Sequence, residues 1–222
     1  MRLFLAALLL IIYNFSASAQ KFSVLGDSSS TFKGAVFPDT NLVWYPEGGK
    51  NDVRKLSDTW VSKFAEKTGF SLDKNNSYSG STICNTGYGK ADYSARSFLA
   101  RAGDLGNPDL ILVFGATNDS WANSPIGEYK YLNFSKKDLY SFRPALACLC
   151  EKLKQTYKGK KIVLILNSEL KDVINQSVTT IAKHYDLPVV VLHDIDKQRG
   201  HPSCQGMTDI ATQVAEVVKG FW

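Results

Sequence analysis

The stretch "DLILVFGATND", Asp109 to Asp119, decides the fold class of this chain. Its unbroken apolar run from Leu110 to Phe114 is bounded by Pro108 and Gly115, as expected for a strand that is covered on both faces. The stretches "KKIVLILN" and "LPVVVLHD" repeat this design later in the chain, and "KFSVLGD" precedes it. These segments predict the strands of a mostly parallel sheet.

Helical patterns separate the predicted strands. In "LSDTWVSKFAEKTGF" apolar residues recur at helical spacing, with Ser57 as the expected N-cap and Gly69 as the expected C-cap. The alternation of strand and helix predicts an α/β fold, a three-layer α/β/α sandwich around a mostly parallel sheet of about five strands. Further helices are expected at Lys137 to Tyr157, Leu170 to Tyr185 and Gln205 to Lys219.

The first residues are typical of a secretory signal peptide. They carry one positive charge, an apolar run from Leu3 to Tyr13 and the small residues Ala17-Ser18-Ala19. We expect cleavage after Ala19, so that residues 1–19 are the signal peptide and residues 20–222 form one domain, secreted or periplasmic. The alternative is a retained membrane anchor, but a spanning helix needs about 20 apolar residues, so we expect no membrane association of the mature form.

Composition and charge argue against a nucleic-acid partner and against a disulfide-based or metal-based fold. A chain of 222 residues that is 44% hydrophobic can bury a full core, and its net charge of +5 is spread along the sequence, so no nucleic acid is expected. Four cysteines are too few for a disulfide scaffold or a structural zinc site, although a bridge between Cys84 and Cys204 stays open. Histidines and carboxylates lack metal-ligand spacing, so we expect no metal and no cofactor.

An open parallel sheet places its ligand site at the carboxyl ends of the strands, and polar residues gather there in "GDSSS", "GATNDSW" and "HDIDKQRGHPS". Ester hydrolysis by a serine needs a base, an orienting group and oxyanion donors. The candidate bases are three histidines. His184 lies late in a predicted helix and His193 alternates with core-facing strand residues, whereas His201 lies in a loop before the last helix and is favoured.

Four short motifs resemble, in order, the four blocks of SGNH (GDSL-type) hydrolases. They are Gly26-Asp27-Ser28, the glycine Gly80 in "NSYSGST", Asn118 in "TND" and His201 in "HPS". The resemblance covers essentially the whole mature chain and implies the flavodoxin-like SGNH hydrolase fold. The segments "SGSTICNTGYGKADYSARSF" and "TNDSWANSPIGEYKY" also resemble a branch of this superfamily that is common among secreted proteins of gut Bacteroidetes.

The resemblance implies a role for each matching residue. Ser28 would be the nucleophile and, through its own N–H, the first oxyanion donor; the backbone N–H of Gly80 and the amide of Asn118 would be the others, and His201 the base. Glycine lets the backbone approach the oxyanion closely, and an amide donates without burying a charge. Ser29 and Ser30 lie further into the turn, where capping is the ordinary use.

Two positions depart from the family pattern. Ala116 stands where the third block usually has glycine, and Gln198 stands three residues before His201, where the family usually has aspartate. Asp196 is the main candidate for orienting His201, and Asp194 is the second. A dyad oriented by a backbone carbonyl is the third alternative, because the far ring nitrogen needs only a good acceptor.

Aromatic residues in the predicted loops suit stacking on sugar rings or covering a small acyl group, although core packing under long loops is an equal alternative. We therefore expect a serine esterase that removes a small acyl group, acetyl above all, from a small-molecule or glycan ester. A thioesterase or lysophospholipase, and a glycan-binding relative without activity, stay open, as does the oligomeric state. The aromatic residues are Trp44, Tyr45, Tyr88, Tyr93, Trp121, Tyr129 and Tyr131.

Overall fold

Five parallel strands form the central sheet of the structure, a computed structural model that describes residues 20–46 and 51–221. Their order is β2-β1-β3-β4-β5, and every neighbouring pair is parallel. This confirms the predicted α/β fold. The strands are β1 (Lys21–Gly26), β2 (Ser71–Asn75), β3 (Leu110–Gly115), β4 (Lys161–Leu166) and β5 (Val189–Val191).

Strand β3 is the centre of the sheet and is buried along its whole length. It pairs with β1 from Phe22 opposite Leu110 to Gly26 opposite Phe114, and with β4 on its other side. Strand β2 was not predicted, because it lies at the edge of the sheet and its sequence "SLDKN" has no apolar run. Burial on both faces therefore explains why the central strands could be predicted from hydropathy.

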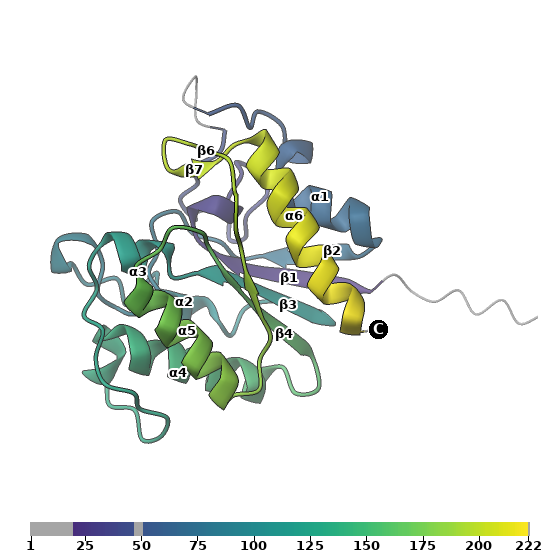
Figure 1. Cartoon of the computed structure of the whole chain (residues 1–222). Coiled ribbons are helices and arrows are strands. Elements are labelled where there is room, and N and C mark those ends of the chain that lie inside the picture. Colours follow the sequence, from purple (N-terminus) through teal and green to yellow (C-terminus); the bar gives the residue numbers. More distant parts are fainter. Residues whose placement is uncertain (1–19, 47–50, 222) are drawn as a thin grey trace, which may run out of the picture.

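Helices cover both faces of the sheet (Figure 1). Side chains alternate along the strands, so that Val24 and Leu112 pack with Trp60 and Met207 on one face, while Leu25 and other residues pack on the opposite face. One layer contains α1 (Trp60–Thr68) and α6 (Cys204–Val218). The other contains α2 (Phe98–Arg101), α4 (Phe142–Thr156) and α5 (Asp172–His184).

Two helix starts differ from the prediction. Helix α1 begins at Trp60 and is capped by the Thr59 hydroxyl rather than by Ser57, because Leu56–Asp58 forms a separate 3-10 turn. Helix α4 begins at Phe142, because a second 3-10 turn, Asp138–Tyr140, precedes it. The predicted C-cap at Gly69 is confirmed, and its φ of 76° is the left-handed conformation that glycine adopts without strain.

Cys84 and Cys204 are free thiols in this structure, so the bridge that the sequence left open is not formed. The Cys84 sulfur is 3.4 Å from the carbonyl oxygen of Thr86. The Cys204 sulfur is 3.2 Å from the carbonyl oxygen of Asp52. Each thiol therefore contacts a different loop.

The predicted signal peptide, residues 1–19, lies outside the described residues. Among residues 20–46 and 51–221, no helix has the length and apolar character needed to cross a bilayer.

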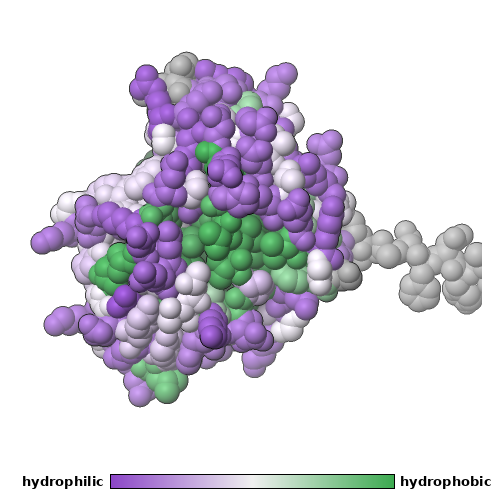
Figure 2. All heavy atoms as spheres, in the orientation of Figure 1, coloured by the Kyte–Doolittle hydropathy of each residue, from purple (hydrophilic) through white to green (hydrophobic). Residues whose placement is uncertain are grey.

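The edge strand β5 leaves apolar surface open to solvent. Figure 2, in the same orientation as Figure 1, shows a hydrophobic area near the middle of the surface in view, between α5 and α6. Val191, the last residue of β5, is 55% exposed. Because β5 is only 3 residues long, it offers a short edge for pairing with another strand.

Candidate active site

The strand order reverses direction between β1 and β3, because the chain adds β2 on one side of β1 and then crosses to the other side. In open parallel sheets this switch point is where ligands bind, at the carboxyl ends of the strands. Ser28 lies two residues after the end of β1, and Asn118 lies in α3 (Thr117–Trp121), the short helix that follows β3. The two residues therefore flank the expected site.

Ser28 begins a tight 3-10 turn, Ser28–Ser30, in which the Asp27 carboxylate accepts a hydrogen bond of 3.0 Å from the Ser29 N–H. Gly26 has no room for a side chain, since a Cβ there would lie 2.5 Å from the Ser77 hydroxyl oxygen. The close packing at Gly26 and the hydrogen bond from the Ser29 N–H to Asp27 thus fix the direction in which the backbone leaves the sheet after β1.

His201 meets Ser28, with its Nε2 atom 2.9 Å from the serine Oγ. The residue His201 is 6% exposed. It lies in a small hairpin formed by β6 (Lys197–Gln198) and β7 (His201–Pro202). The connecting residues Arg199 and Gly200 both have positive φ, 53° and 76°, which is the pattern of a two-residue type I′ turn. The hairpin therefore positions the imidazole of His201 beside the Ser28 hydroxyl.

The structure corrects the expectation for the third catalytic group. Gln198 pairs with His201 across the hairpin, so the position three residues upstream is a cross-strand neighbour. The Asp196 carboxylate accepts a hydrogen bond from the Ser203 hydroxyl at the start of α6 instead of orienting the imidazole. Asp194 is exposed and pairs with His193 at 2.9 Å. The carbonyl oxygen of Arg199 lies 3.3 Å from Nδ1 of His201, which is the third alternative from the sequence.

The variants Asp196→Asn and Asp194→Asn are each expected to keep at least about a third of the wild-type ester turnover, because the Asp196 carboxylate binds the Ser203 hydroxyl and the Asp194 carboxylate binds His193. Asp196→Asn weakens the start of α6, so its melting temperature is expected to fall while its kcat stays close to that of the wild type. Initial rates with an activated acetyl ester, measured beside thermal unfolding, check this. A loss of about 10²-fold at an unchanged melting temperature would return Asp196 to the catalytic machinery.

Asn118 has the geometry of an oxyanion donor. Its Nδ2 donates one hydrogen bond of 3.0 Å to the carbonyl of Ser81 and keeps a second N–H. The Tyr88 hydroxyl donates to Oδ1 of Asn118 at 2.8 Å, which fixes the direction of the amide. Gly80, one residue before Ser81, has a φ of 78° and open space where a Cβ would lie. Within the described part of the chain, no backbone hydrogen bond engages the N–H of Ser28 or of Gly80.

Two buried charged residues to which the sequence analysis assigned no role hold these segments together. Asp119 accepts backbone hydrogen bonds from Ile83 at 2.8 Å and Cys84 at 3.1 Å, so it ties the end of β3 to the loop after Gly80. Arg101 donates to the Ser81 hydroxyl at 2.8 Å and to the Gly26 carbonyl. Asp119 is the last residue of the quoted motif "TND", whereas no motif marks Arg101, and for both residues the structural role depends on burial.

Asp27 makes the folded state more stable in mild acid. Burial raises its pKa from 3.8 to about 6, so between these values the folded protein holds a proton that the unfolded chain has lost. Its contribution to the free energy of unfolding therefore falls as pH rises from about 4 to about 6, by about 3 kcal/mol. Denaturant unfolding of wild type and Asp27→Asn across this range tests this. The wild type is expected to lose stability relative to the variant, and parallel curves would contradict the assignment.

The other histidines lie elsewhere. His184 is the last residue of α5 and stacks on Tyr131 at a centroid distance of 3.7 Å. His193 lies beyond the end of β5 at Val191, and its side chain is 73% exposed and pairs with Asp194. Of the loop aromatics, Trp44, Tyr45 and Trp121 surround His201, as described below.

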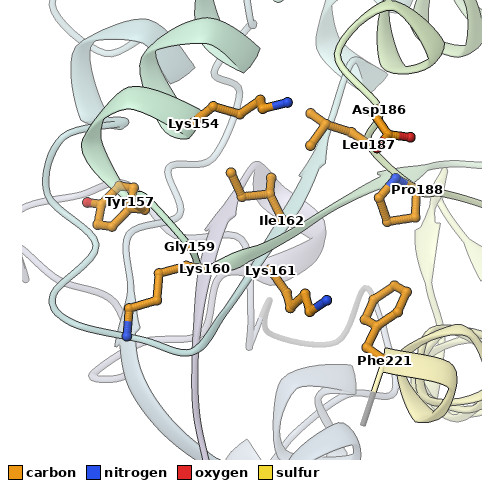
Figure 3. Close-up of a pocket in the computed structure, with 10 residues that line it drawn as sticks. All are labelled: Lys154, Tyr157, Gly159, Lys160, Lys161, Ile162, Asp186, Leu187, Pro188 and Phe221. Carbon is orange, nitrogen blue, oxygen red and sulfur yellow. The ribbon is translucent and has the colours of Figure 1, made fainter.

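A separate pocket of about 290 Å³ lies at the other end of the strands from Ser28 (Figure 3). Ile162 near the start of β4 and Pro188 just before β5 contribute to its wall, so it faces the amino ends of the strands. This pocket is therefore not part of the Ser28 site. Among the described residues, no group of three His, Cys, Asp or Glu side chains could hold a metal ion.

The Ser28 hydroxyl is hydrogen-bonded to a buried histidine at the switch point of an open parallel sheet. This is the arrangement of serine-dependent α/β hydrolases. The sequence profile described as GDSL-like Lipase/Acylhydrolase matches residues 20–218, and the chain belongs to this family of ester hydrolases. The predicted resemblance is thereby confirmed. A comparison with curated proteins gave no match.

Two solved structures are similar over nearly the whole chain. A candidate GDSL-like lipase from Bacteroides uniformis is 54% identical, with a TM-score of 0.90, over 91% of this chain and 97% of its own. A candidate GDSL-like lipase from Bacteroides ovatus is 48% identical, with a TM-score of 0.90, over 91% and 99%. A family two carbohydrate esterase from Clostridium thermocellum in complex with cellohexaose, 15% identical with a TM-score of 0.60 over 90% and 64%, shares the fold.

Proposed function

We propose that this protein is an exported serine esterase that removes small acyl groups, acetyl above all, from carbohydrate. The observation that carries the proposal is the 2.9 Å contact between the Ser28 hydroxyl and Nε2 of His201. A nucleophile within hydrogen-bond reach of a base is the signature of covalent catalysis by serine. Export is inferred from the apolar run and the small residues before Gln20.

In the proposed reaction, Nε2 of His201 takes the proton of the Ser28 hydroxyl as its oxygen attacks the ester carbonyl. The negative oxygen of the tetrahedral intermediate accepts hydrogen bonds from the N–H groups of Ser28 and Gly80 and from the amide of Asn118. His201 then protonates the departing alcohol oxygen, which leaves Ser28 acylated. Water, deprotonated by His201, attacks the acyl-enzyme, and as the bond from the acyl group to the Ser28 oxygen breaks, His201 returns the proton to that oxygen and the carboxylic acid departs.

The aromatic surroundings support a carbohydrate ester as substrate. Trp121 is 41% exposed and meets the His201 ring edge-on, and Tyr88 is 40% exposed beside Asn118. Exposed indole and phenol rings next to a reacting centre suit stacking against sugar rings. The structural relative bound to cellohexaose has the same fold, which is consistent with a glycan reaching such a site.

A panel of esters tests the proposed substrate. Purified protein without residues 1–19 is expected to hydrolyse p-nitrophenyl acetate and acetylated oligosaccharides at least about tenfold faster, in kcat/KM, than p-nitrophenyl laurate, acyl-CoA or a lysophospholipid. Ser28→Ala serves as the blank. Faster turnover of long acyl chains would favour the lysophospholipase or thioesterase alternative. Binding of oligosaccharide without turnover of any ester would favour a glycan-binding protein.

A further inference from the structure

The face of the His201 ring is covered by Trp44. The two ring centroids are 3.7 Å apart and the planes differ by 8°, which is a close parallel stack. Tyr45 and Trp121 approach the same ring edge-on, with centroids at 6.3 Å and 5.7 Å. Trp44 therefore makes the closest aromatic contact with the proposed base.

Trp44 is also tied to the nucleophile through Thr31. The Trp44 backbone N–H donates to Oγ1 of Thr31 at 2.8 Å, and this hydroxyl donates to the carbonyl oxygen of Ser28 at 2.9 Å. Next to these bonds the Lys33 N–H donates to the Tyr45 carbonyl at 2.8 Å. The serine turn and the segment that carries the indole are thus held together as one unit.

Stacking constrains the motion that would disable the base. Rotation of the imidazole about its Cβ–Cγ bond moves Nε2 away from the Ser28 hydroxyl, and an indole at 3.7 Å leaves no room for the ring to turn out of plane. The indole face also attracts the positive charge that the imidazole gains when it takes the serine proton. Both effects favour proton transfer more than they favour substrate binding.

We propose that Trp44 is a positioning residue of the esterase reaction, acting through His201, and that Thr31 links it to Ser28. This inference rests on the proposed function, because it assigns His201 the role of base. It differs from a role in sugar binding, since the face of the indole that would stack on a sugar is here occupied by the imidazole.

The test compares Trp44→Leu, which removes the aromatic face, with Trp44→Phe, which keeps one. With p-nitrophenyl acetate, Trp44→Leu is expected to lower kcat by about 10- to 100-fold with KM changed less than about twofold. Trp44→Phe is expected to recover at least about a third of the wild-type kcat. The rate at which a fluorophosphonate labels Ser28 is expected to fall in parallel with kcat, because labelling also needs the activated serine.

A matched control is Phe221→Leu, which removes a ring that lines the pocket at the amino ends of the strands, away from the Ser28 site. It is expected to leave kcat and KM unchanged. If Trp44→Leu does not fold, the pair Thr31→Val and Thr31→Ser replaces it. Valine keeps the shape without the hydroxyl and is expected to lower kcat about tenfold, and serine is expected to restore it.

The possible outcomes separate the two proposals. If the wild type turns over esters and Trp44→Leu keeps its kcat, the positioning role is wrong while the esterase function stands. A rise in KM without loss of kcat would make Trp44 a substrate-binding residue and would also overturn the inference. If the wild type neither turns over esters nor reacts with the fluorophosphonate, the proposed function fails and the positioning role fails with it.

Discussion

Ser28→Ala is expected to abolish ester turnover, with a loss of about 10⁴-fold or more in kcat. The Ser28 hydroxyl is the one that lies 2.9 Å from Nε2 of His201, and alanine leaves this base without a nucleophile to activate. Loss of a triad serine costs several orders of magnitude in serine hydrolases, because the remaining groups stabilise only the attack of water. Steady-state rates with p-nitrophenyl acetate, beside a thermal unfolding curve of the variant, measure this.

The neighbouring serines provide matched controls. Ser30 accepts a hydrogen bond of 3.1 Å from the indole N–H of Trp60, so Ser30→Ala is expected to lower stability by about 1 kcal/mol and activity by less than tenfold. Ser29→Ala is also expected to cost less than tenfold, since the Asp27 carboxylate binds the backbone N–H of Ser29, which the substitution keeps. If Ser28→Ala were active and one of these variants inactive, the nucleophile would be assigned wrongly.

Asn118→Ala is expected to lower kcat by about 10²- to 10³-fold, which is the usual cost of losing one oxyanion donor. The amide acts on the charge that develops in the transition state, so KM is expected to change little. The variant also loses the hydrogen bond to the Ser81 carbonyl, and its unfolding must be measured alongside.

Tyr88→Phe is the companion variant for Asn118→Ala, because it keeps the amide and removes only the hydroxyl that orients it. A loss of no more than about tenfold is expected, since Ser81 still holds the amide. An unchanged kcat in Asn118→Ala would show that the oxyanion is stabilised by other donors.

The fold was predictable because β1, β3 and β4 are buried on both faces and read as apolar runs. Two local features that the sequence did not predict, strand β2 and the start of α1, depend on hydrogen bonds to other residues of the chain. Strand β2 is mostly polar and becomes a strand by pairing with β1 at the edge of the sheet. The start of α1 moved to Trp60 because the residues before it close a 3-10 turn, in which the Asp58 side chain binds backbone N–H groups of the preceding residues.

Short motifs predicted the positions of Ser28, Asn118 and His201 near the carboxyl ends of the strands, and the structure places the Ser28 hydroxyl beside His201, while their catalytic roles stay predictions. The sequence could not decide among the three alternatives for the group beside Nδ1 of His201, because the Arg199 contact uses a backbone carbonyl, which every residue type has. The run "KQRGHP" does contain the signal of a two-residue hairpin, a glycine in the second turn position. Such a hairpin makes Gln198 the cross-strand partner of His201.

The central claim, that Ser28 is a nucleophile activated by His201, is tested most directly by labelling with a fluorophosphonate. Intact mass and peptide mapping of the folded protein are expected to show one adduct per chain, on Ser28, with labelling slowed at least about 10²-fold in His201→Ala. An unlabelled wild-type protein, an adduct on Ser29 or Ser30, or equal labelling rates in wild type and His201→Ala would contradict it.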